Sequence, residues 1–71
     1  MNRDYLSMQI QKYRYAATPA EQDEVLTNTG VHIKAIKYQE VSTDAQGLYV
    51  LSQRQRNQVL NALRQKGYRM E

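Results

Sequence analysis

The sequence predicts an α+β protein with the ferredoxin-like order strand, helix, strand, strand, helix, strand. Three observations lead to this fold. Helix-capping residues stand at Thr18 and Ser52, apolar and polar residues alternate between the two predicted helices, and a polar segment, 42–47, separates two apolar runs. An antiparallel sheet with two helices on one face agrees with all three. We expect residues 1–71 to form a single domain of this kind.

The size and composition of the chain restrict its class. A protein of 71 residues buries a small share of its surface, which favours support from a partner subunit. The absence of Cys excludes disulfides and thiolate chemistry. No apolar run approaches the roughly 20 residues of a membrane span, and the first residues lack the apolar core of a signal peptide. We therefore expect a cytoplasmic protein without a membrane partner.

The first segment, residues 5–15, fits two structures. Leu6, Met8 and Ile10 alternate with polar residues at the period of a strand, and the two tyrosines that follow favour strands. Leu6, Ile10 and Tyr13 also fall at the spacing of one helix face. We favour the strand.

The helical alternative for the first segment leads to a different fold. Residues 3–16 would be a helix, and the capped helix 19–29 would follow it as part of a helix-turn-helix. Residues 36–51 would then form a wing.

The first predicted helix has clear boundaries. Thr18 can cap the first free amides, Pro19 suits the first helical position, and Glu21 stands where a capping-box carboxylate reaches back to the cap. Gly30 is free to adopt the left-handed conformation that ends a helix. A helix over residues 19–29 is therefore expected.

A β-hairpin is expected from Gly30 to Leu51. Apolar residues alternate with polar ones over residues 31–38, with a change of parity near Ala35 that indicates a bulge. The composition of residues 42–47 is typical of a turn, and the apolar run 48–51 is typical of a buried strand.

The second predicted helix begins with Ser52 and Gln55 as a capping box and runs to about Lys66. Gly67 suits the position that follows a helix end. Residues 68–70 are then expected to form the last short strand.

Several apolar and glycine-containing segments follow one another in the second part of the chain: Val25-Leu26, Thr29-Gly30-Val31-His32-Ile33, Ile36, Leu60-Asn61-Ala62-Leu63 and Gly67-Tyr68-Arg69-Met70. In these residues the chain resembles an ACT domain, a small regulatory module with the ferredoxin-like fold. The resemblance covers residues 25–70 and implies a regulatory role. Where ligand-binding ACT domains typically carry an Asp-x-Pro-Gly-like turn, this chain has Ala17-Thr18-Pro19-Ala20, which keeps the proline alone.

No catalytic, metal or cofactor signature is present in the sequence. His32 is the single histidine, whereas a structural zinc site needs about four ligands. Gly30 and Gly47 are isolated, so no phosphate-binding glycine loop exists. We expect no catalytic residues, no metal site, no cofactor and no enzymatic activity.

The candidate site is a tyrosine-bearing face of the predicted sheet, edged by cations. Such a face can stack nucleic-acid bases, or it can form a subunit interface, where tyrosine is also enriched. We favour the interface. The residues of this face are Tyr13, Tyr15, Lys12, Arg14, Lys34, Tyr38 and Tyr49.

The sequence thus favours a small non-enzymatic regulatory or adaptor module that acts as a homodimer. It would bind a small metabolite or dock onto a partner protein. The alternative is a nucleic-acid-binding protein that uses the basic tyrosine face, which the net charge of +3 permits. The cations of the second predicted helix are expected on a solvated helix surface; they are Arg54, Arg56, Arg64 and Lys66.

Overall fold

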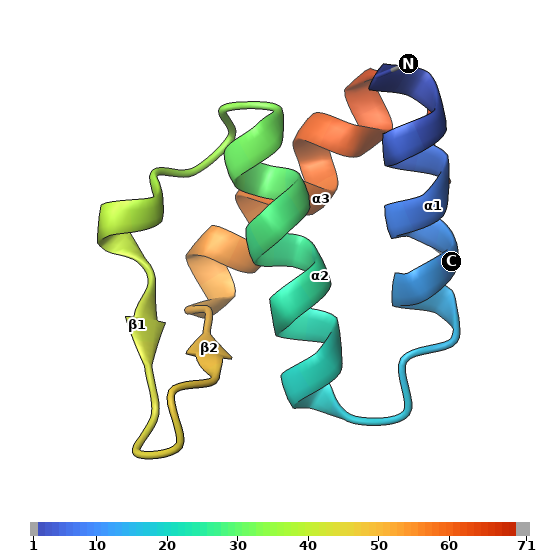
Figure 1. Cartoon of the computed structure of the whole chain (residues 1–71). Coiled ribbons are helices and arrows are strands. Elements are labelled where there is room, and N and C mark those ends of the chain that lie inside the picture. The colour runs from blue at the N-terminus through green and yellow to red at the C-terminus, as the bar shows by residue number, and fades with distance from the viewer. Residues whose placement is uncertain (1, 70–71) are drawn as a thin grey trace.

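The computed structural model describes residues 2–69. It contains α1 (Asn2–Arg14), α2 (Pro19–His32), the 3₁₀ helix η1 (Tyr38–Glu40), β1 (Ser42–Thr43), β2 (Tyr49–Val50) and α3 (Gln53–Gln65). α2 lies between α1 and the hairpin, and α3 packs behind α2 (Figure 1). The predicted ferredoxin-like fold is therefore wrong: in the described residues, three α-helices enclose the core, and the sheet has two strands.

α1 replaces the strand that was expected over residues 5–15. Leu6 and Ile10 are buried, and Tyr13 packs against the same core. These three residues are four and three positions apart, which is the spacing of one helix face. Met8, which completed the strand alternation, is 57% exposed. The rest of the segment is rich in Gln, Lys and Arg, which favour helices. The helical alternative is confirmed here as far as Arg14.

α2 begins as predicted. Thr18 has extended backbone angles, and its Oγ1 accepts a hydrogen bond from the Glu21 N–H at 3.2 Å. Pro19 occupies the first helical position, where no amide bond is lost. The Glu21 carboxylate lies 3.2 Å from the Thr18 hydroxyl, which donates to it.

The predicted end of α2 at Gly30 is wrong, because the helix continues to His32. Lys34 takes the left-handed conformation instead, with φ of 63°. The Ala35 N–H donates to the Gly30 carbonyl at 2.8 Å, and the Lys34 N–H donates to the Val31 carbonyl at 3.1 Å. These two bonds define a Schellman motif, which removes the strand expected over residues 31–38.

Gly30 serves helix packing rather than helix termination. A Cβ atom at this position would lie 2.6 Å from Cγ2 of Val59 in α3 and 2.9 Å from Cγ1 of Ile36. The absence of a side chain therefore allows α2 to approach α3 closely.

The hairpin is much shorter than the predicted span from Gly30 to Leu51. Ser42 pairs with Val50 and Thr43 pairs with Tyr49 in antiparallel register. The turn between them is confirmed: Asp44 Oδ1 accepts bonds from the backbone of residues 46 and 48, and Gly47 has φ of 80°.

α3 agrees closely with its prediction. The Gln55 N–H donates to Ser52 Oγ at 3.1 Å, and the Ser52 N–H donates to Gln55 Oε1 at 2.9 Å, which completes the capping box. Gly67 follows the helix with φ of 94°. Tyr68 and Arg69 form no strand, and Met70 lies outside the described residues.

The core combines side chains of the three α-helices with Ile36, which precedes η1, and Leu51, which follows β2. Beside it, Asp23 of α2 is buried and links the helices. Its carboxylate accepts bonds from Arg56 Nη2 in α3 at 3.0 and 3.1 Å, and from the Leu51 N–H at 3.2 Å. This network fixes the start of α3 against α2. The core residues are Leu6, Ile10, Leu26, Ile36, Leu51, Val59 and Leu63.

None of the helices within residues 2–69 combines the length and the apolar character needed to cross a membrane.

Candidate functional site

α3 presents a continuous polar surface to solvent. Val59 and Leu63 face the core and are fully buried, so the opposite side of the helix is exposed. The exposed residues recur at intervals of three and four, which places them along one face. α3 contains no acidic residue. We define the polar face of α3 as Arg54, Asn57, Gln58, Asn61, Arg64 and Gln65.

The capping box fixes the N-terminal end of this face. Arg56 is directed toward Asp23 and is therefore neutralised, whereas Arg54, two residues earlier, is exposed. The side chains at these two positions diverge because residues two apart on a helix do not share a face. Arg54 thus belongs to the polar face and Arg56 to the structural network.

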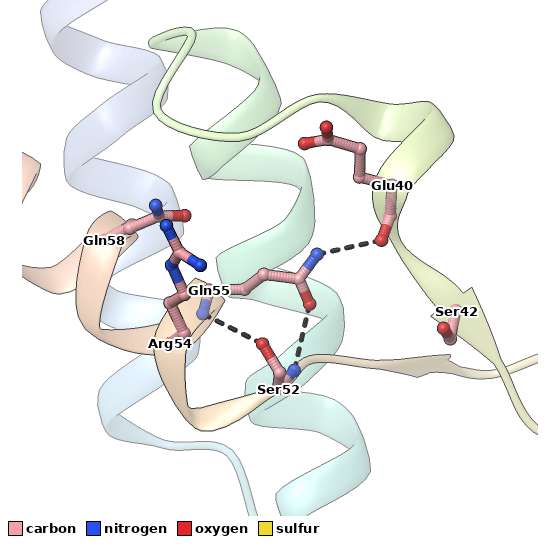
Figure 2. A pocket seen from close by; sticks show the side chains of 6 residues that line it. All are labelled: Glu40, Ser42, Ser52, Arg54, Gln55 and Gln58. Atoms are coloured by element: carbon pink, nitrogen blue, oxygen red, sulfur yellow. Dashed lines mark hydrogen bonds between the residues drawn. The ribbon is translucent and has the colours of Figure 1, made fainter.

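An open cavity of about 610 Å³ lies beside the start of α3, against η1 and β1. Figure 2 shows how its wall is held. Gln55 completes the capping box with Ser52 and also donates from Nε2 to the Glu40 carbonyl at 2.9 Å. Arg54 and Gln58 of the polar face line the same cavity, so the two features form one surface. The full lining is Glu40, Ser42, Ser52, Arg54, Gln55 and Gln58.

The charges around this surface are unequal. Arg54, Arg64 and Lys66 are exposed cations of α3 and its cap. Glu40 is the acidic residue of the cavity lining, and the described structure contains no ion pair between it and Arg54. The surface is therefore predominantly positive, with one carboxylate that opposes anion binding at its edge.

The chemistry of the lining is that of hydrogen bonding and charge pairing. Ser52 Oγ is occupied by the Gln55 N–H, and the lining contains no histidine that could act on it as a base. His32 lies in the last turn of α2 and packs against Tyr5, with ring centroids 4.5 Å apart and the ring planes tilted by 44°. Within residues 2–69, no group of three or more His, Cys, Asp or Glu residues is arranged to hold a metal ion.

The residues predicted as a sheet face do not form one, because the sheet has two short strands. The structure brings Tyr38 and Tyr49 together, with hydroxyl oxygens 2.8 Å apart and the rings edge to face. It also places Lys12 and Tyr15 along the same depression of the surface. The residues of the predicted face are spread over the chain: Lys12, Tyr13 and Arg14 in α1, Tyr15 directly after α1, Lys34 after α2, Tyr38 in η1 and Tyr49 in β2.

The sequence predicts the cations of α3 on a solvated helix surface, and the amides between them were not part of the predicted site. The available signal was the absence of acidic residues over residues 53–66, together with Asn57, Gln58 and Asn61 at helical spacing. What the sequence did not show is that α3 has one side free of other elements.

Comparison with protein families, with curated proteins and with solved structures gives no match for this chain.

Proposed function

We propose that this protein is a non-enzymatic module that binds duplex DNA through the polar face of α3. The observation that carries the proposal is the composition of this face: two exposed arginines and four exposed amide side chains on one helix surface without an acidic residue. Arginine pairs with guanine in the major groove, and Asn and Gln pair with adenine.

The dimensions of α3 suit this role. Its 13 residues span about 20 Å, and a helix is about 10–12 Å wide with its side chains. The major groove of B-DNA is about 12 Å wide and admits one helix. Asn57, Asn61 and Arg64 would then face base edges, while Arg54 and Lys66 lie near the two ends, where phosphates pass.

α2 is less suited to contact DNA, although it follows α1 in the order of a helix-turn-helix. Its first turns carry the exposed acidic residues Glu21 and Glu24. Phosphates would repel this end of the helix. The charge distribution therefore favours α3 over α2 as the helix that enters the groove.

A titration of fluorescent duplexes tests the proposal. The wild-type protein should bind with an affinity that falls as salt rises. Arg54→Gln and Arg64→Gln should each weaken binding by about 1–3 kcal/mol, or lower the salt slope by about one unit where the arginine contacts a phosphate. Glu40→Gln should strengthen binding, because it removes the carboxylate at the edge of the surface.

Lys37→Gln is the matched control, since it removes the same charge from an exposed residue outside α3 and outside the cavity lining. It should change affinity much less than Arg54→Gln. Equal losses of affinity in the two variants would show that binding depends on net charge and not on the polar face of α3. Undetectable duplex binding at low salt would contradict the proposal.

The regulatory or adaptor role expected from the sequence stays a prediction, and the cavity bears on one form of it. A volume of about 610 Å³ falls within the range of small-ligand pockets. Such pockets are usually enclosed and mostly apolar. This cavity is open and lined by polar side chains. An open, polar cavity is better suited to part of an extended charged partner than to an enclosed metabolite.

A further inference from the structure

α1 carries a second exposed surface that the proposed function does not use. Tyr15 is 85% exposed and continues the helical pattern, because its N–H donates to the Gln11 carbonyl at 3.1 Å. Met8 lies two turns earlier, and Gln11 and Lys12 lie between them at three- and four-residue spacing. We call these four residues the α1 seam. The spacing is that of one side of a helix–helix contact.

The seam borders a depression between α1 and the start of α2. This cavity has a volume of about 420 Å³ and is lined by Lys12, Tyr15, Ala16, Glu21, Glu24 and Val25. A second depression of about 300 Å³ is lined by Met8, Gln11, Lys12 and Tyr15 themselves. Tyr15 and Lys12 line both, so the two depressions adjoin each other at these residues.

The two walls of this surface carry opposite charges. Lys12 lies on the α1 side, and Glu21 and Glu24 lie on the α2 side. The described structure contains no ion pair between Lys12 and either carboxylate. Both charges are thus available to an approaching molecule.

We propose that this surface binds a second copy of the same chain, with the two α1 seams packed antiparallel about a two-fold axis. An interface of this symmetry must be self-complementary. An axis near Gln11 and Lys12 places Met8 of one copy against Tyr15 of the other, a favourable sulfur–aromatic pair. Lys12 of each copy then faces the acidic wall of its partner.

Charge complementarity is the reason to assign the surface to a second copy rather than to another protein. The seam supplies a cation and two exposed side chains with large apolar parts, Met8 and Tyr15, and the adjacent wall supplies two carboxylates. One chain therefore carries both halves of the contact. A chain of 71 residues, which buries little surface alone, gains from such an association.

Sedimentation equilibrium over a range of concentrations tests the dimer. The wild type should pass from 8.3 kDa to twice that mass as concentration rises. Lys12→Glu and Glu24→Lys should each raise the dissociation constant at least about tenfold, since each places like charges opposite one another. A mixture of the two variants should restore association in trans, because each new charge then meets its opposite.

Circular dichroism of each variant confirms that the exposed substitutions leave the helices folded. Lys37→Gln, outside the seam, should dimerise as the wild type does. A wild-type protein that remains monomeric at all concentrations would overturn the proposal that the α1 seam binds a second copy of the chain. Dimerisation that persists in both charge variants, or that the mixture does not restore, would also overturn it.

Discussion

At the scale of single residues, two buried threonines in α2 differ in one hydrogen bond. Thr27 Oγ1 donates to the Asp23 carbonyl at 2.7 Å, whereas the equally buried Thr29 Oγ1 has no partner in the described structure. An unpaired buried hydroxyl is unfavourable, and a paired one contributes about 1 kcal/mol.

The two threonines therefore give opposite predictions for the same substitution. Thr29→Val should leave the free energy of unfolding unchanged or raise it, because it removes an unsatisfied group at nearly constant volume. Thr27→Val should lower it by about 1 kcal/mol. Urea denaturation of the two variants measures the difference. A larger loss for Thr29→Val than for Thr27→Val would show that the Thr29 hydroxyl has a partner in solution.

The paired tyrosines give a prediction that depends on pH. The hydrogen bond with Tyr38 is the main cause that raises the pKa of Tyr49 above 10.0, and desolvation and the nearby Glu24 act in the same direction. Because the folded-state pKa is the higher one, this contribution to stability is complete below pH 10 and is lost as pH rises through the pKa of Tyr49.

Tyr38→Phe removes the hydrogen bond and should therefore lower the pKa of Tyr49. Carbon NMR of labelled tyrosine rings, followed through an alkaline titration, resolves Tyr49 from the other tyrosines. The loss of stability above pH 10 should become smaller in the variant. An unchanged pKa of Tyr49 would mean that the two hydroxyls are not bonded in solution.

At the scale of elements, α2 and α3 end in the same motif with different residues at the left-handed position. Lys34 occupies it after α2, with φ of 63°, and Gly67 after α3, with φ of 94°. In both motifs the following residue donates to the carbonyl five positions earlier, at 2.8 Å for Ala35 and 3.0 Å for Tyr68. A lysine in this conformation costs about 1–2 kcal/mol, which a glycine avoids.

Lys34→Gly should therefore raise the free energy of unfolding, by about 0.5–1 kcal/mol once the added freedom of the unfolded chain is subtracted. Gly67→Ala is the matched change in the opposite direction and should lower it by about 1 kcal/mol. Among the described residues, apart from the chain neighbours of Gly67, no atom lies within 4 Å of the position that a Cβ would take, so the substitution acts through backbone conformation. Thermal denaturation compares the two, and a destabilised Lys34→Gly would contradict this account of the α2 end.

The elements with strong local signals were predictable from sequence. Thr18 with Pro19, and Ser52 with Gln55, mark helix starts through contacts within one turn, and both starts are confirmed. Asp44 likewise organises the turn of the hairpin through its own neighbours. Each of these signals depends on residues close in the chain.

The wrong predictions concern elements whose structure depends on contacts between residues far apart in the sequence. The alternation at Leu6, Met8 and Ile10 fits a strand. Only the packing of α1 against α2 shows that Leu6 and Ile10 are buried while Met8 is exposed to solvent. Gly30 suggested a helix end, whereas its absent side chain accommodates Val59, 29 positions later in the sequence.

The candidate site was predictable in part for the same reason. The cap and cations of α3 are local features, and the sequence gives them directly. The exposure of one complete side of α3 depends on the way Val59 and Leu63 pack in the core. The Tyr38–Tyr49 contact depends on the loop after Lys34, whose left-handed conformation a lysine does not indicate.

At the scale of the whole molecule, charge is divided between elements. α3 carries cations and no acidic residue, while the start of α2 carries Glu21 and Glu24 beside the α1 seam. α3 packs behind α2, and α1 lies on the other side of α2 from the hairpin (Figure 1). The two proposed surfaces use different residues of different helices, so substitutions in the seam can be separated from substitutions in the polar face of α3.

The central claim is that α3 is the DNA-binding element, and amide chemical shifts of the labelled protein during addition of a duplex test it most directly. We predict that the shifts that change will cluster on residues 53–66 and on the cavity wall around Glu40. The amides of the α1 seam should change little. Changes centred on α1 or on the start of α2, or no change at low salt, would contradict the account.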